Sequence, residues 1–169
     1  MVKIKGSCVY ETVTCYLRRG NKVLLLYRNK KEVDINKGKW IGVGGHIEAN
    51  EDPIDAVVRE VKEEANYDLI DFSKKAIIIF NFGKEIEIMH LFVATKFKGK
   101  INPDCNEGEL AWVDISKLPE LEMWDGDRIF LPPVLNNAPF FEMVLYYKGD
   151  ELLKYKLLNE PVDMKEYLK

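Results

Sequence analysis

One segment of the sequence constrains the fold of this chain more than any other, the stretch GGHIEANEDPIDAVVREVKEEAN at residues 44–66. Asp52 has a typical helix N-cap side chain, and Pro53 suits the first helical position, where a missing N–H is no loss. Behind them, apolar residues recur at helical spacing and are expected to form a buried stripe. These residues are Ile54, Val57, Val58, Val61 and Ala65. The segment therefore predicts a Gly-Gly turn followed by one amphipathic helix that packs against a core.

Three glutamates of this helix, Glu60, Glu63 and Glu64, fall within one arc of about 100° on a neighbouring face. Like charges at such spacing destabilise an isolated helix by a few tenths of a kcal/mol each. One interpretation is a solvated face with local pairs, such as Arg59 with Glu63. The other is a cation site, because hard oxygen ligands clustered on one face are typical of Mg²⁺ or Mn²⁺ sites. Two or three carboxylates and a backbone carbonyl of the Gly-Gly turn would hold such an ion and leave positions for water and phosphate.

Apolar, β-rich runs occupy much of the remaining chain, and several are paired across short turns such as Gly149-Asp150. The runs expected to form strands are 8–17, 22–28, 40–45, 74–82, 85–97, 108–115, 140–147 and 151–157. A short second helix is expected at 126–137, where Pro132 and Pro133 weaken the pattern. Many strands and one or two helices predict an α+β fold in which helices pack on a mixed β-sheet.

Length and composition set the broad class of the protein. A chain of 169 residues with 47% apolar residues predicts one domain with a substantial core. The net charge of −3 does not suit a protein that coats a nucleic-acid polymer. Cys8, Cys15 and Cys105 lack metal-type spacing and are expected to be reduced thiols. Because the chain shows neither a signal peptide nor a run of ~20 apolar residues, we expect a cytoplasmic protein that does not enter a membrane.

The helical segment and its lead-in resemble the Nudix box, G-x5-E-x7-R-E-U-x-E-E-x-G-U, in which U is a bulky apolar residue. The matching positions are Gly45, Glu51, Arg59, Glu60, Val61, Glu63 and Glu64. Asn66 stands where the family has glycine, and Tyr67 fills the last apolar position. Glycine closes the helix there in a left-handed conformation, and asparagine is its usual substitute. We therefore expect Asn66 to be left-handed and do not take it as a sign of lost activity.

The resemblance implies a single Nudix hydrolase domain over residues 1–169, with an α/β/α sandwich, and an enzyme that hydrolyses a nucleoside diphosphate linked to a further group. The implied metal ligands are Gly44, through its carbonyl, and Glu60, Glu63, Glu64 and Glu107. Structural roles are implied for Gly45, Glu51, Arg59 and Asn66. The candidate catalytic residues are Glu60, Glu63 and Glu107, and both Glu60 and Glu107 are candidates for the group that accepts a proton from water. His90 alternates with apolar residues along its strand and is expected in the core rather than as a base.

Four further stretches resemble the MutT-like 8-oxo-dGTP diphosphatases, which remove oxidised purine nucleotides. These stretches are GKWIGVGGHIE, CNEGELAWVDI, MWDGDRIFL and APFFEMVLYYKGDELL. Trp124 either offers a flat face on which a purine can stack or packs in the core beside Met123, and Asp127 offers a carboxylate to the donors of a purine edge. Gly126 stands where some relatives have a second aspartate, so Asp125 is an open candidate to replace it. Ile41 stands where one relative has a base-reading asparagine.

Two further positions complete the expected substrate site. Arg28 and the lysines of residues 30–39 are expected either to meet a triphosphate or to form a solvated basic loop. Thr12 aligns with a pocket position of the relatives. With Ile41, Trp124, Asp125 and Asp127, these are the candidate substrate-binding residues.

The favoured hypothesis is Mg²⁺-dependent hydrolysis of a purine nucleoside triphosphate to the monophosphate and pyrophosphate, with 8-oxo-dGTP as the preferred substrate and Mn²⁺ as an alternative ion. One rival is hydrolysis of another nucleoside diphosphate derivative, such as ADP-ribose or a nucleotide sugar. The other is a non-catalytic Nudix module that binds nucleotides or a regulatory partner. We expect a small-molecule nucleotide ligand, no nucleic-acid polymer, and a monomer or homodimer.

Overall fold

Long paired strands organise this chain, and the computed structural model describes residues 2–4 and 7–159. The strands are β1 (Val2–Ile4), β2 (Ser7–Arg19), β3 (Lys22–Arg28), β4 (Trp40–Ile41), β5 (Val43–His46), β6 (Tyr67–Asn81), β7 (Glu85–Gly99), β8 (Gly108–Asp114), β9 (Phe141–Lys148) and β10 (Glu151–Asn159). The helices are α1 (Pro53–Ala65), the 3-10 helix η1 (Ile115–Glu120) and α2 (Asp125–Leu135). The sheet has the order β10-β9-β6-β7-β2-β3-β4, while β1 and β5 pair with β2, and β8 pairs with β3.

Strand β2 connects the parts of this sheet because it pairs with several neighbours. It runs parallel to β7 and antiparallel to β5. The register places Thr12 opposite His46 on β5 and opposite Met89 on β7. Thr14 lies opposite Gly44. Gly44 and Gly45 of β5 and the acidic residues Glu85 and Glu87 of β7 therefore both lie beside β2.

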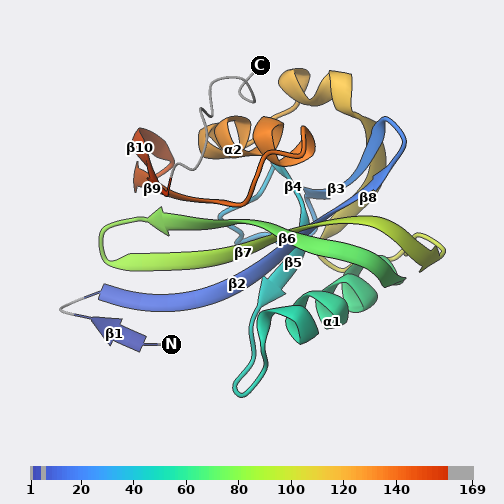
Figure 1. Ribbon diagram of the computed structural model, residues 1–169, viewed down its shortest axis with the longest axis horizontal. Helices are drawn as coiled ribbons and strands as arrows, with labels where there is room; N and C mark the ends of the chain where they lie inside the picture. The colour runs from blue at the N-terminus through green and yellow to red at the C-terminus, as the bar shows by residue number, and fades with distance from the viewer. Residues whose placement is uncertain (1, 5–6, 160–169) are drawn as a thin grey trace.

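Side chains of β2 alternate between two cores on opposite faces of the sheet. Val13, Cys15 and Leu17 are fully buried in the core that contains the apolar face of α1. Tyr16 is buried in the other core, which contains the apolar side of α2 and Trp124. Figure 1 shows α1 on one side of the sheet and α2 on the other. The predicted mixed sheet flanked by helices is therefore confirmed.

Helix α1 begins and ends at the predicted residues. The Asp55 N–H donates a 2.8 Å hydrogen bond to Asp52 Oδ1, and Pro53 is the first helical residue. Asn66 follows the last helical residue with φ 64° and ψ 34°, and its N–H bonds to the Lys62 carbonyl. The left-handed conformation predicted for Asn66 is confirmed.

The predicted apolar stripe of α1 is wrong at two positions. Val57, Val61 and Ala65 are buried, whereas Ile54 and Val58 are 56% and 38% exposed. The buried residues repeat every four positions and form one row that faces the sheet. Ala56 is buried as well, so the buried face extends away from Val58, which lies at its solvent edge, while Ile54 lies in the first turn of the helix.

Several other elements differ from the prediction in length. β6 begins at Tyr67, directly after the helix cap, instead of at residue 74. Its first half pairs with β7, with Leu69 opposite Phe97, and its apolar residues lose regular alternation where the register shifts on either side of Asp71. β1 and η1 were not predicted. Helix α2 runs over residues 125–135 rather than 126–137, and its two prolines lie in its last half.

The described structure bears on the expectations about membrane spans and about the cysteines. No helix within residues 2–4 and 7–159 is long and apolar enough to span a bilayer. Cys8, Cys15 and Cys105 are free thiols, as their spacing predicted. The cytoplasmic location stays a prediction.

Candidate active site

Gly44 and Gly45, predicted as a turn, lie instead within strand β5, and both pack too closely against their neighbours to carry side chains. A Cβ atom on Gly44 would lie 1.9 Å from the Val13 carbonyl oxygen of β2. A Cβ atom on Gly45 would lie 2.6 Å from the carboxylate carbon of Glu60. Glycine at these two positions therefore allows the Glu60 carboxylate of α1 to rest directly on the strand.

Arg59 joins α1 to the loop that precedes it. Its guanidinium donates two 2.8 Å hydrogen bonds to the two carboxylate oxygens of Glu51 and one of 3.1 Å to the His46 carbonyl. It also donates to Glu60 Oε1 at 2.8 Å and to Glu63 Oε2 at 3.3 Å. The hydrogen bonds from Arg59, followed by one from a backbone N–H, lower the pKa of Glu51 to about 2. Glu51 and Arg59 thus hold the loop and the helix together in this structure.

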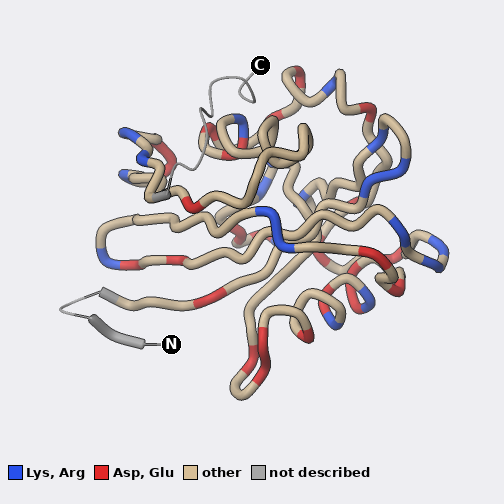
Figure 2. The backbone as a smooth tube through the Cα atoms, in the orientation of Figure 1, with Lys and Arg blue, Asp and Glu red and all other residues tan. Residues whose placement is uncertain are grey.

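The three predicted metal glutamates of α1 differ in environment, within a helix and lead-in loop that are rich in acidic residues (Figure 2). Glu60 is 13% exposed, whereas the Glu63 side chain is 60% exposed and points to solvent. Glu64 Oε2 is buried and has no hydrogen-bond partner among the described residues. Burial, and then the neighbouring charges of Glu107 and Glu60, raise the pKa of Glu64 to about 9. Burial also raises the pKa of Glu60.

Glu107 approaches the α1 glutamates from the loop before β8 and is held there by two cations. Arg28 Nη1 lies 2.9 Å from Glu107 Oε2, and Lys31 Nζ lies 3.2 Å from Glu107 Oε1. Arg28 also bonds Asp34 through Nε at 2.7 Å. The structure therefore brings together Arg28, which was predicted to meet a triphosphate, and Glu107, which was predicted to bind a metal ion.

The acidic cluster fits a divalent cation in chemistry but is not drawn together around a preformed site. Among residues 2–4 and 7–159, no group of three or more histidine, cysteine or acidic side chains could hold a metal ion as positioned. Arg59 forms ion pairs with Glu60 and Glu63, and Arg28 forms one with Glu107. The unpartnered Glu64 oxygen, however, lies among these like charges. An added cation would supply the partner that this oxygen lacks.

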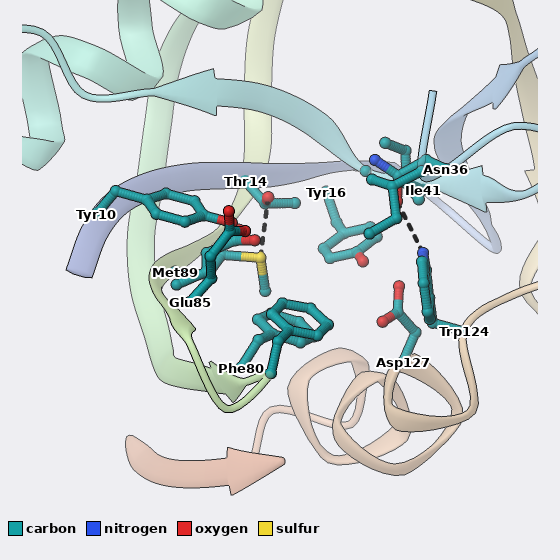
Figure 3. Close-up of a pocket in the computed structure, with 14 residues that line it drawn as sticks. Tyr10, Thr14, Tyr16, Asn36, Ile41, Phe80, Glu85, Met89, Trp124 and Asp127 are labelled. Atoms are coloured by element: carbon teal, nitrogen blue, oxygen red, sulfur yellow. Dashed lines mark hydrogen bonds between the residues drawn. The ribbon is translucent and has the colours of Figure 1, made fainter. Parts of the chain in front are cut away.

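A separate cavity of about 140 Å³ opens between the sheet and α2 (Figure 3). We call it the aromatic cavity. It is lined by Tyr10, Thr14, Tyr16, Ile35, Asn36, Ile41, Gly42, Phe80, Phe82, Glu85, Glu87, Met89, Trp124 and Asp127. Three predicted substrate-binding residues, Ile41, Trp124 and Asp127, therefore come together here.

Trp124 is held in place by contacts at its edge and face. Its indole Nε1 donates a 2.7 Å hydrogen bond to Asn36 Oδ1, which Figure 3 marks. Its ring meets Tyr147 edge-on with a centroid distance of 5.5 Å. The Lys39 ammonium lies 5.0 Å from the ring centroid. The ring is thus oriented before any ligand binds.

Asp127 points into the aromatic cavity, as Figure 3 shows. It is 6% exposed, and its carboxylate makes no hydrogen bond or ion pair with any residue in the described part of the chain. Burial, and then the charge of Glu87, raise its pKa to about 8. Asp125 is exposed at the start of α2 and does not line this cavity. A side chain at Gly126 would come within 2.6 Å of Leu145, so this position has no room for the second aspartate of some relatives.

A wider cleft of about 360 Å³ adjoins the aromatic cavity and is lined in part by Gly44 and Gly45. We call it the Gly-Gly cleft. Its predicted residues are Thr12, Arg28, Ile41, Gly44, Gly45 and Glu107. Seven residues line both spaces: Tyr10, Thr14, Ile35, Asn36, Ile41, Gly42 and Glu87. A ligand can therefore extend from the aromatic cavity to Gly44, Gly45 and Glu107.

Glu87 was not predicted from the sequence, although it lines both the aromatic cavity and the Gly-Gly cleft. Thr12 Oγ1 donates a 2.7 Å hydrogen bond to Glu87 Oε2. The signal was present in the alternation EIEIM, which places Glu85, Glu87 and Met89 on one face of β7. The same alternation is typical of a strand with one solvated face, so the sequence alone does not place these acids at a site. His90 is on the other face, buried, with its ring nitrogens 2.9 Å from Lys74 Nζ and 3.0 Å from Glu11 Oε1.

A model of the NUDIX domain matches residues 10–133. The chain belongs to the Nudix family. This Nudix chain is 30% identical over 149 residues to an uncharacterized Nudix hydrolase, YvcI, of Bacillus subtilis strain 168, which covers 85% of the chain and 90% of that relative. It is 30% identical over 129 residues to the oxidized purine nucleoside triphosphate hydrolase of Danio rerio, covering 75% of the chain and 82% of that relative.

Solved structures give the same assignment. The fold of the Nudix chain matches a mutator MutT protein from Bacillus halodurans with a TM-score of 0.80 and 28% identity, over 90% of this chain and 99% of that one. The predicted Nudix resemblance with MutT-like relatives is confirmed. The chain is a Nudix hydrolase that acts on pyrophosphate bonds, and Nudix hydrolases generally use divalent cations.

Proposed function

We propose that this Nudix hydrolase cleaves a purine nucleoside triphosphate, with 8-oxo-dGTP as the favoured substrate, to the nucleoside monophosphate and pyrophosphate. The observation that carries the proposal is the continuity of the aromatic cavity with the Gly-Gly cleft. A flat aromatic cavity suits a base, and a cleft with cations and carboxylates suits phosphates. The relative from Danio rerio is named for hydrolysis of oxidized purine nucleoside triphosphates, which supports the same substrate class.

In this proposal, the base enters the aromatic cavity beside Trp124 and Asp127. Stacking on an aromatic ring stabilises a bound base by about 1–3 kcal/mol. With a pKa of about 8, Asp127 is mostly protonated at neutral pH and can both donate and accept a hydrogen bond. Such a group suits a purine edge that presents a carbonyl next to an N–H. Asp125 is not assigned to base binding, because it does not line the aromatic cavity.

The triphosphate would extend along the Gly-Gly cleft, where Arg28 and Lys31 supply positive charge. Glu60, Glu64, Glu107 and the Gly44 carbonyl would hold Mg²⁺ or Mn²⁺, with Glu63 joining them by a side-chain rotation. The bound cation would neutralise phosphate charge. Glu60 and Glu107 are the candidates to accept a proton from the attacking water. Arg59 would then position Glu60, to which it already donates a hydrogen bond of 2.8 Å.

Product analysis tests this function against its rivals. The purified protein is incubated with 8-oxo-dGTP, dGTP, dCTP, ADP-ribose and a nucleotide sugar, each with Mg²⁺, with Mn²⁺ and with a chelator. We expect pyrophosphate and the monophosphate from the purine triphosphates, fastest from 8-oxo-dGTP, and no turnover with the chelator. Cleavage of ADP-ribose or the nucleotide sugar in preference to every triphosphate would contradict the proposal, and absence of any metal-dependent turnover would favour a non-catalytic module.

A further inference from the structure

The carboxylate of Glu87 occupies the junction of the two spaces that form the proposed substrate site. Of the acidic residues in the described chain, only Glu87 lines both the aromatic cavity and the Gly-Gly cleft. Asp127 lines the cavity without reaching the cleft, and Glu107 lines the cleft without reaching the cavity. Glu85 also lines the cavity and Asp34 also lines the cleft, so Glu87 is the one acid of the described chain that an extended ligand would pass in both spaces.

Neighbouring strands hold the Glu87 side chain in a defined orientation. Tyr10 lies opposite Glu87 in the parallel pairing of β2 with β7, and Phe80 lies opposite it on β6. The hydrogen bond from Thr12 holds one carboxylate oxygen, Oε2, on the side of the cleft. Tyr10 also hydrogen-bonds this carboxylate, and because an ionised carboxylate has about four lone-pair positions, about two are left for a ligand.

The surroundings of Glu87 also disfavour a purely structural role. Burial raises its pKa, which means that its charge is poorly solvated. Its negative charge adds to the raised pKa of Tyr10 and of Asp127. The carboxylate forms no ion pair with a described residue, although His46 lies near enough to stabilise its charge. A half-buried acid with spare acceptors beside two open spaces is suited to a ligand that brings hydrogen-bond donors.

We propose that Glu87 binds a sugar hydroxyl of the nucleotide and thereby selects substrates by their sugar. This inference rests on the proposed function, in which the base lies in the aromatic cavity and the phosphates lie in the Gly-Gly cleft. The sugar joins base to phosphate, so it must cross the junction where Glu87 lies. Carboxylates commonly accept hydrogen bonds from ribose hydroxyls in nucleotide sites. A base-edge role is disfavoured because Thr12, which orients Glu87, lines the cleft and not the cavity.

A set of guanine nucleotides that differ only in the sugar tests this assignment. We would measure kcat/KM for GTP, dGTP and 2′,3′-dideoxyguanosine triphosphate with wild type, Glu87→Met and Glu87→Gln. Methionine keeps the size of the side chain and removes the acceptors, whereas glutamine keeps one of them. The matched control is Glu151→Met, which makes the same change at an exposed residue of β10 that lines neither space.

We expect wild type to prefer the hydroxyl-bearing nucleotides over the dideoxy form by roughly 10- to 100-fold, which corresponds to one hydrogen bond to a charged group. Glu87→Met should remove this preference and leave kcat/KM for the dideoxy nucleotide within about twofold of wild type, with Glu87→Gln in between and Glu151→Met unchanged. The proposal is overturned if a well-folded Glu87→Met protein keeps the preference. It is also overturned if Glu87→Met lowers kcat/KM equally for all three nucleotides.

Binding of the monophosphates separates this inference from the proposed function. Titration calorimetry with dGMP and 2′,3′-dideoxyguanosine monophosphate needs no turnover. If the wild-type protein hydrolyses no triphosphate, the proposed function fails, and the sugar assignment is decided by calorimetry alone. Tighter binding of dGMP that disappears in Glu87→Met supports the assignment, whereas equal binding of the two monophosphates by wild type contradicts it.

Discussion

At the scale of single residues, Glu64 carries the strongest sign of a missing partner. One of its oxygens is buried without a hydrogen bond inside the described chain, and neighbouring Glu107 and Glu60 repel its charge. Such a group destabilises the protein when ionised alone and is stabilised by a cation. The environment of Glu64 therefore supports the predicted metal role by physics that is independent of the family resemblance.

Replacement of this carboxylate should separate activity from stability. We predict that Glu64→Gln lowers kcat by at least ~10²-fold for every substrate, because the charge clamp on the reacting phosphate loses a ligand. Without divalent cations the variant should melt at or above the wild-type temperature, because a repulsion is removed. Glu151→Gln on β10 is the matched control and should leave both quantities unchanged. Near-normal turnover by well-folded Glu64→Gln would contradict the metal assignment.

Asp127 gives a prediction about pH. Its folded-state pKa of about 8 lies above the unfolded value near 3.8, so the folded state binds the proton more tightly. Stability from this group is therefore fully present below about pH 4 and falls as the pH rises toward 8, by up to about 1.4 kcal/mol per pH unit. Asp127→Asn removes this dependence. Its melting temperature should rise relative to wild type between pH 5 and pH 8, and a constant difference across that window would show that the pKa of Asp127 is not raised.

At the scale of elements, the end of α1 makes a sharp prediction. Asn66 is left-handed at φ 64°, and this is a conformation that glycine adopts freely and β-branched residues avoid. Asn66→Gly should therefore change stability little or raise it, although it removes the 3.1 Å bond from Asn66 Nδ2 to the Lys100 carbonyl. Asn66→Val should cost on the order of 1 kcal/mol or more. Thermal melts in which valine is tolerated as well as glycine would contradict this account of the cap.

Local signals of this kind explain which elements could be predicted from the sequence. The cap of α1, its length and most strands depend on residues close together in the chain, and these predictions agree with the structure. Ile54 and Val58 were assigned wrongly because periodicity gives the apolar arc but not which part of it meets the sheet. The first half of β6 was missed because its pairing partner on β7 lies far along the sequence.

At the scale of the whole molecule, the substrate site depends on contacts that no short segment contains. Parallel pairing of β2 with β7 brings Thr12 to Glu87, and the packing of α2 brings Asp127 to the same space. The family resemblance predicted Trp124 and Asp127, and physical reasoning from the sequence gave them plausible roles. Glu87 could not be predicted in this way, because its importance arises only where the two spaces meet. The roles of all these residues stay predictions until they are measured.

In the proposed function, the aromatic cavity reads the base, while Glu107 and the three glutamates of α1 support hydrolysis. The two functions should therefore respond to different substitutions. Trp124 also packs against Tyr147 and bonds Asn36, so Trp124→Ala removes structural contacts as well as a stacking surface. Trp124→Phe keeps an aromatic ring and serves as the control for folding. Asp127→Asn changes the hydrogen-bonding pattern at the base without a large change in volume.

The most direct test is the ratio of kcat/KM for 8-oxo-dGTP to that for dGTP or dCTP, measured in wild type, Trp124→Ala, Trp124→Phe, Asp127→Asn and Glu64→Gln. Loss of stacking or of a matched hydrogen bond should cost about 1–3 kcal/mol and should depend on the base. We predict that Trp124→Ala and Asp127→Asn change the ratio, that Trp124→Phe changes it less, and that Glu64→Gln lowers all rates with the ratio intact. A ratio that stays flat across wild type, Trp124→Ala and Asp127→Asn would show that neither residue reads the base and would contradict the account.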